Sequence, residues 1–157
     1  LFVPLASGMF LLQIGTYPAS AHVEWPGASS ANPWYDAFLW IRHNTPRSAV
    51  FALDPGYMLR TGEDMAGFRA IAERSTLADA VKDSGAVSLF PALADEWQNE
   101  LRSTLGWRHF ELADFRRLTG QYPVTWFVVE LPAPAGLLCL YRNQGVAVCT
   151  LPSIAVR

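Results

Sequence analysis

Apolar residues are concentrated at the start of the chain. Residues 1–12 carry no charge, and no charged residue precedes Glu24. A helix of twelve residues is about 18 Å long, whereas the hydrocarbon core of a bilayer is about 30 Å thick. We interpret residues 1–16 as the end of a truncated transmembrane helix. Two alternatives stay open: a secretory signal cleaved near Ala21, and a buried helix or strand of a soluble protein.

The segment that follows this apolar start has no Lys or Arg before Arg42. Cytoplasmic flanks of membrane helices are enriched in these residues, so the pattern favours the extracytoplasmic side. Residues 17–31 are rich in Ala, Ser, Pro and Gly, which is typical of a linker. We therefore expect a linker at 17–31, a soluble α/β domain at 32–152 and a tail at 153–157.

Residues 32–46 are typical of a helix with defined ends. Asn32 can cap the helix, and proline is favoured at the first helical position, where Pro33 stands. Apolar side chains recur at helical spacing at Trp34, Phe38 and Ile41. The residue before a proline disfavours helical backbone, so the helix should end before Pro46.

Strand-like and helix-like segments alternate along the rest of the chain. Strands are predicted at 49–54, 75–79 and 124–129. Helices are predicted at 61–73, with a capping box from Thr61 to Asp64, from Pro91 to Gly106, and around 112–120. Residues 137–151 read as two strands about a turn. This order predicts an α/β fold: a small three-layer, Rossmann-like domain whose mainly parallel sheet ends in a C-terminal antiparallel hairpin.

The two cysteines of the chain lie on the two arms of this hairpin. Residues 143–145 fit a three-residue loop with Gly145 in the left-handed conformation. Pairing that is symmetric about the middle residue places Cys139 opposite Cys149, close enough for a disulfide after modest adjustment. A bridge would suit an oxidising compartment. The alternative is a pair of buried thiols.

Composition excludes several classes of function. Hydrophobic residues make up 51% of the 157 residues and charged residues only 17%, so a folded domain is expected. The net charge is −2 and no basic stripe is present, which argues against nucleic-acid binding. No nucleotide-binding, hydrolase or zinc-protease motif occurs, and the three histidines are far apart in sequence. We expect no cofactor, no metal site and no catalytic residue in this chain.

One region of the sequence is a candidate ligand site. Asp54 follows the first predicted strand, and ligands of open α/β sheets bind beyond the carboxyl ends of strands. Arg69, Arg74 and Lys82 could hold an anionic group there. The alternative is that Arg69 pairs with Glu73 on a helix surface, while Arg74 and Lys82 are ordinary solvated side chains.

The order of motifs adds a resemblance that covers about Trp40 to Leu151. The motifs are WIRHNTPRSAVFALDP, FRAIAERSTLADAVKD, a helix with Glu96 and Trp97, then TWFVV and LYRNQGVAVC. They resemble the C-terminal extracytoplasmic domain of an uncharacterised family of bacterial multi-spanning membrane proteins, similar in layout to C-type glycosyltransferases. The matching positions are Asn44, Thr45, Pro46, Phe68, Arg69, Arg74, Ser75 and Lys82.

The resemblance implies an accessory extracytoplasmic domain of a polytopic protein in the bacterial cell membrane, with no catalytic centre of its own. Its expected partners are the membrane, the upstream transmembrane portion and a lipid-linked or polysaccharide substrate. Two other hypotheses stay open. One is a secreted or membrane-anchored α/β ligand-binding domain. The other is a free-standing cytosolic enzyme with a ligand at Asp54, Arg69 and Arg74.

Overall fold

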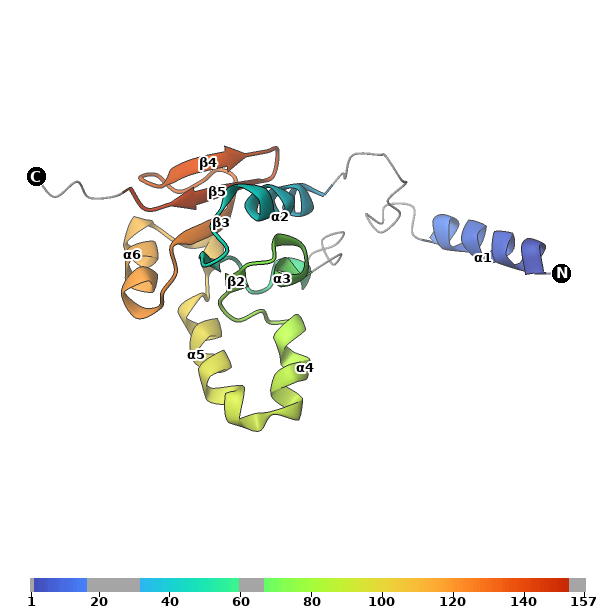
Figure 1. Ribbon diagram of the computed structural model, residues 1–157, viewed down its shortest axis with the longest axis horizontal. Helices are drawn as coiled ribbons and strands as arrows, with labels where there is room; N and C mark the ends of the chain where they lie inside the picture. Colours follow the sequence, from blue (N-terminus) through green and yellow to red (C-terminus); the bar gives the residue numbers. More distant parts are fainter. Residues whose placement is uncertain (1, 17–31, 60–66, 153–157) are drawn as a thin grey trace, which may run out of the picture.

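The computed structural model describes residues 2–16, 32–59 and 67–152 (Figure 1). The predicted linker at 17–31, the cleavage site near Ala21 and the tail at 153–157 lie outside these residues. The described parts form a mixed α/β structure, which confirms the predicted class. Its α-helices are α1 (Phe2–Thr16), α2 (Pro33–Asn44), α3 (Phe68–Ala72), α4 (Lys82–Leu89), α5 (Ala94–Ser103) and α6 (Leu112–Gln121).

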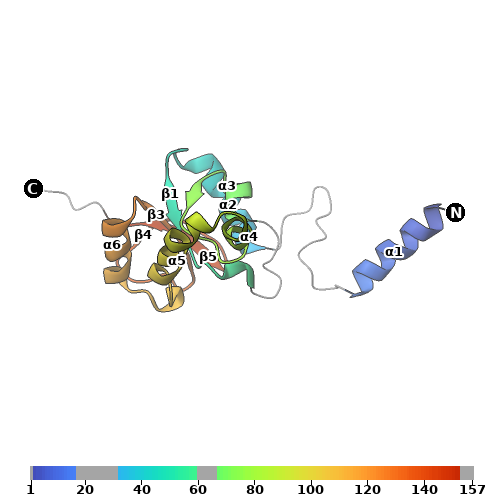
Figure 2. The same ribbon diagram turned by 90° about the horizontal axis from the view of Figure 1, so that it is seen from below.

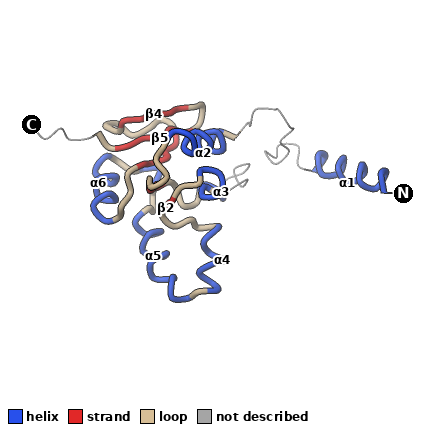
Figure 3. Tube along the Cα trace, in the orientation of Figure 1, coloured by secondary structure: helices blue, strands red, loops and turns tan. Residues whose placement is uncertain are grey.

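One sheet organises the domain (Figure 3). Its five strands are β1 (Val50–Ala52), β2 (Ser75–Thr76), β3 (Trp126–Glu130), β4 (Leu138–Arg142) and β5 (Val146–Thr150), in the order β2-β1-β3-β5-β4. β1 is parallel to β2 and β3, whereas β5 is antiparallel to β3 and β4. The sheet described here is therefore evenly divided between the two kinds of pairing, not mainly parallel, because β5 enters between β3 and β4.

Side chains from both faces of the sheet are buried, in two separate cores. Along β3, Val128 joins a core with α2 and α3, whereas Phe127 and Val129 join a core with α6 and the short 3-10 helix η3 (Trp107–His109). Figures 1 and 2 place α3 and α6 on opposite sides of the sheet. Strands that are covered on both faces read as nearly unbroken apolar runs, which is why 49–54 and 124–129 were predicted correctly.

Helix α2 forms as its local sequence predicts. The Asn32 side chain accepts hydrogen bonds from the backbone N–H groups of Trp34 at 2.9 Å and Tyr35 at 3.3 Å. The helix ends at Thr45, whose N–H and hydroxyl both donate to the carbonyl oxygen of Ile41, at 3.1 and 2.7 Å. This end supports the site described below.

The middle of the chain differs more from the prediction. Of the helix expected at 61–73, α3 is described, and the capping box at Thr61 and Asp64 lies outside the described residues. Glu73, with φ of 50°, ends α3 in the left-handed conformation. Helix α4 was not predicted, because its sequence shows no apolar stripe at helical spacing.

Helices α4 and α5 form a hairpin that projects from the sheet, joined by the 3-10 helix η2 (Pro91–Leu93) (Figure 1). None of these three elements contains a fully buried residue. Leu93 and Leu105, near the two ends of the helix predicted from Pro91 to Gly106, are 47% and 69% exposed. Gly106 ends this part of the chain as predicted, with φ of 76°.

The C-terminal hairpin pairs Cys139 with Cys149, and their sulfur atoms form a disulfide. The register then shifts by one residue between Cys139 and Tyr141, so the hairpin is not symmetric throughout. The sequence predicted a left-handed Gly145, but its φ is not positive. Its role is steric. A Cβ atom there would lie 2.7 Å from Cγ of Pro33, so only glycine fits against the start of α2.

Candidate functional site

The four candidate ligand residues do not form one cluster. Arg74 is 7% exposed, and its guanidinium contacts the ends of two helices. Nη2 donates to the carbonyl oxygens of Arg42 at 2.7 Å and Thr45 at 2.6 Å. Nε donates to Oγ1 of Thr45 at 3.1 Å, and Nη1 donates to the carbonyl oxygens of Ala72 and Glu73 at 3.3 and 3.0 Å.

These partners explain why a buried cation is tolerated at this position. The last carbonyl groups of a helix carry partial negative charge and lack partners within the helix, so a guanidinium supplies both donors and charge. Arg74 therefore holds α2, α3 and β2 together. Because the guanidinium is buried among these carbonyl groups, the interpretation of Arg74 as a solvated side chain was wrong, and its ligand role stays a prediction.

Arg69 also has a structural role, although it stays partly exposed. Nη1 lies 2.6 Å from Oδ1 of Asp83, and Nη2 donates to the carbonyl oxygens of Thr76 at 3.0 Å and Leu77 at 3.3 Å. These contacts tie α3 to the end of β2 and to α4. The expected pair with Glu73 is replaced by a pair between Glu73 and Arg42 at 2.8 Å.

Asp79, which the sequence analysis did not select, organises the start of α4. Its Oδ1 accepts from the backbone N–H groups of Val81 at 2.7 Å and Lys82 at 2.9 Å, and its own N–H donates to Oδ2 of Asp83 at 2.8 Å. This reciprocal arrangement resembles a capping box. The positive end of α4 is therefore already occupied by a carboxylate of the chain itself. The two aspartates are four positions apart, one more than in a capping box, so the standard sequence signal does not point to them.

Asp54 has a turn role at the carboxyl end of β1. Its Oδ1 accepts from the N–H of Gly56 at 2.9 Å. The next carbonyl oxygen, that of Pro55, accepts from the N–H of Ala80 at 3.0 Å. The loop after β1 therefore contacts the loop that contains Asp79. The Asp54 side chain itself is not among the residues that line the groove described next.

A groove of about 490 Å³ lies beside this network, and its lining residues are Gly67, Phe68, Arg69, Ala70, Thr76, Asp79 and Lys82. Two of the four candidates, Arg69 and Lys82, thus come together here. Lys82 is the single lysine of the whole chain. Its side chain passes over Gly67, where an added Cβ would lie 3.3 Å from Cγ of Lys82. It is exposed and makes no ion pair with any residue that the structure describes.

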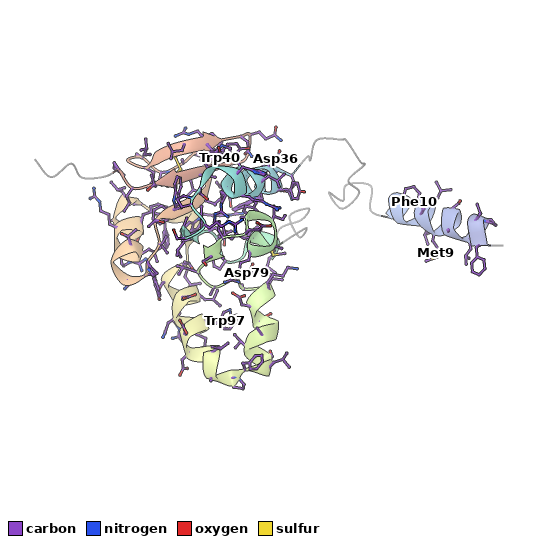
Figure 4. All side chains as sticks on the ribbon, viewed as in Figure 1. Met9, Phe10, Asp36, Trp40, Asp79 and Trp97 are labelled. Atoms are coloured by element: carbon purple, nitrogen blue, oxygen red, sulfur yellow. A yellow bond between two sulfur atoms is a disulfide. The ribbon has the colours of Figure 1, made fainter. Side chains whose placement is uncertain are left out.

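Acidic and aromatic groups from other elements lie behind the groove. Trp97 on α5 donates from Nε1 to the carbonyl oxygen of Asp79 at 3.2 Å (Figure 4). Burial raises the pKa of Glu100, a hydrogen bond with the backbone of Ala78 acts against this, and the charge of Glu96 adds to the rise. The phenol of Tyr57 accepts from the N–H of Phe68 at 2.9 Å, and burial, followed by the charge of Asp79, raises its pKa well above the usual range.

This arrangement does not favour a strongly charged ligand. The cations Arg69 and Lys82 are matched by the carboxylates of Asp79 and Asp83, and Arg69 is already engaged. A groove lined by the exposed Lys82, the engaged Arg69 and Thr76 suits a neutral ligand with several hydroxyl groups. Within the described ranges, no group of three metal-binding side chains occurs.

Comparisons with protein-family models, with curated proteins and with solved structures found no match to this chain. Among the helices that the structure describes, none has both the length and the apolar character needed to cross a bilayer.

Proposed function

We propose that this chain is a membrane-anchored accessory domain outside the cytoplasm. It belongs to a polytopic bacterial envelope protein whose layout is similar to that of C-type glycosyltransferases, and it contributes binding, not catalysis. Its anchor is α1, which continues a membrane segment of that protein. The observation that carries the proposal is the exposure of α1.

Helix α1 is apolar on all sides and has no charged residue. Most of its large side chains are exposed over most of their surface: Phe2, Val3, Leu5, Met9 and Leu11 are each 63% exposed or more. A helix that is hydrophobic all round is normally covered by a protein core or by lipid. Because no described part of the domain covers α1, lipid is the cover that we propose. At about 22 Å, its described length reaches most of the way through a bilayer core.

The disulfide supports the extracytoplasmic part of the proposal. Bonded cysteines persist in oxidising compartments and are rare in the cytosol. Cys149 is fully buried and Cys139 packs against the same core, so the bond lies within the folded sheet. The two cores on opposite faces of the sheet support a three-layer, Rossmann-like arrangement, which we include in the proposal.

Flotation with vesicles tests the anchoring. The full chain is reconstituted from detergent with phosphatidylcholine vesicles and centrifuged through a density gradient. We expect the chain to float, and the variant Leu5→Asp/Met9→Asp to remain at the bottom, since each buried aspartate costs about 3 kcal/mol. The control is Leu138→Asp/Leu140→Asp, which charges two exposed leucines of β4 and should float like the original chain. If the original chain, with α1 unchanged, failed to float, the proposal would be contradicted.

A second candidate function is a secreted or anchored domain that binds a hydroxylated ligand in the groove. The exposed side chain of Lys82, which lines the groove together with Asp79, favours it. Because the chain has a single lysine, amine-reactive labelling reports on this groove, with the α-amino group as internal reference. We expect soluble oligosaccharides to slow the labelling of Lys82 and leave the reference rate unchanged. Equal rates with and without every oligosaccharide tested would remove this candidate.

A further inference from the structure

The end of the α4–α5 hairpin carries an exposed apolar surface, which we call the tip patch: Leu89, Phe90 and Leu93. These side chains are 77%, 62% and 47% exposed. They lie where α4 passes into η2, at the end of the hairpin farthest from the sheet (Figure 1). Burying a leucine or phenylalanine side chain is favourable, so a cluster of three at one projecting end indicates a contact surface.

Charge is absent from the same part of the hairpin. From Ser84 to Ala94 no side chain is ionisable, and the nearest charges are Asp83 and Asp95 on either side. A projecting end of this kind can enter an apolar medium without burying a charge, which would be costly. The patch is also convex, so it requires a partner that deforms around it or that offers a matching pocket.

We propose that the tip patch inserts into the surface of the same lipid bilayer that holds α1. This rests on the proposed function, which places lipid beside the domain. The same bilayer then covers both exposed apolar surfaces, α1 and the tip patch. The fifteen residues at 17–31 between the two described parts can span at most about 50 Å. This reach allows the domain to turn its hairpin toward the membrane. Insertion would fix the orientation of the domain, and with it the direction in which the groove at Lys82 opens.

Spin labelling of the full chain tests this insertion. Both native cysteines are bonded, so an added cysteine can be labelled selectively. Ala92→Cys places the label in η2 beside the patch, and Ala113→Cys places a control label on the exposed surface of α6. Collision rates with oxygen, which enters lipid, and with a nickel chelate, which stays in water, are measured in phosphatidylcholine vesicles.

We expect the Ala92→Cys label to gain oxygen collisions and lose nickel collisions in vesicles, and the Ala113→Cys label to change little. Adding Leu89→Ser/Phe90→Ser/Leu93→Ser should return the Ala92→Cys label to water while the chain still floats through α1. A chain that floats with both labels equally open to nickel overturns the tip proposal alone. A chain that does not float overturns this proposal together with the proposed function. In the absence of vesicles, protection of the label from nickel that increases with protein concentration would show that the patch binds a second copy of the chain. This result would also overturn the proposal of insertion into lipid.

Discussion

Arg74 binds Thr45 through two separate groups: its Nε donates to Oγ1 at 3.1 Å and its Nη2 donates to the carbonyl oxygen at 2.6 Å. The same Thr45 closes α2 by donating its own hydroxyl to Ile41 at 2.7 Å. One buried guanidinium therefore fixes where α2 ends relative to β2. This in turn positions the chain from β2 to α4 that forms one wall of the groove.

Replacing Arg74 with methionine should destabilise the domain strongly. Methionine keeps the apolar stem but leaves several buried carbonyl groups without donors, and hydrogen bonds to charged groups contribute about 1.5–3 kcal/mol each. We expect a loss of about 3 kcal/mol in the free energy of unfolding, measured by urea denaturation. The matched control is Arg102→Met, since Arg102 is exposed and, among the described residues, its side chain hydrogen-bonds only Gln98 and Asn99 of its own helix. Similar losses in both variants would argue against a structural role specific to Arg74.

The contact between Gly145 and Pro33 predicts a steric effect. A Cβ at position 145 would lie 2.7 and 2.9 Å from two ring atoms of Pro33, and a proline ring cannot move aside as a flexible side chain can. Gly145→Ala should therefore cost about 1–3 kcal/mol. Gly85→Ala is the control, because no atom lies within 4 Å of its added Cβ and alanine favours helix, so it should be neutral or stabilising. Thermal unfolding measures this: we expect a lower midpoint for Gly145→Ala than for Gly85→Ala, and equal midpoints would contradict the steric role of Gly145.

Removing the disulfide should weaken the hairpin end of the sheet. The bond closes a loop with a sequence separation of 10 residues, and a loop of this size is worth about 2–3 kcal/mol through the entropy of the unfolded chain. We expect Cys139→Ala/Cys149→Ala to lose about this much, and a reducing agent to destabilise the original chain by a similar amount. The reducing agent should leave the free energy of unfolding of the double variant unchanged. A further loss in that variant would show that reduction acts elsewhere.

Glu100 should make stability depend on pH in a defined direction. Burial raises its pKa from the ordinary value of 4.5. The folded chain therefore binds this proton more tightly than the unfolded chain does. The ionised carboxylate costs stability at neutral pH, and the cost disappears as the pH falls through the raised pKa to below 4.5. Glu100→Gln should be more stable than the original chain at pH 7, and the difference should vanish near pH 4. Parallel urea titrations across this range measure it, and a constant difference would contradict the assignment.

Local signals explain what could be predicted from the sequence. The start of α2 was predicted because its cap, Asn32, and its first-turn proline are adjacent in the chain. The predicted pairing of Cys139 with Cys149 is confirmed, although the turn sets another register: Tyr141 lies opposite Val148, and the shift between Cys139 and Tyr141 restores the expected pair. Helix α4 has neither an apolar stripe nor an adjacent cap. The side chain that bonds the N–H groups at its start is that of Asp79, which the pattern placed in a strand, so this helix and the residue that organises it were missed.

The candidate site required information from distant parts of the chain. Arg69 and Lys82 both line one groove, and Asp83 and the end of β2 hold Arg69 in place there. Arg74 lies only five positions after Arg69, yet it points to carbonyl groups that are 29 and 32 residues away in sequence. No pattern along the chain distinguishes a buried arginine of this kind from a ligand-binding one.

The central claim is that α1 holds the domain at a membrane. The most direct measurement is the distribution of the chain between membrane and soluble fractions of bacterial cells after alkaline carbonate washing, for the original chain and for Leu5→Asp/Met9→Asp. The account predicts that the original chain stays in the membrane fraction with Cys139 and Cys149 bonded, and that the variant is released. Complete release of the original chain by carbonate would contradict it.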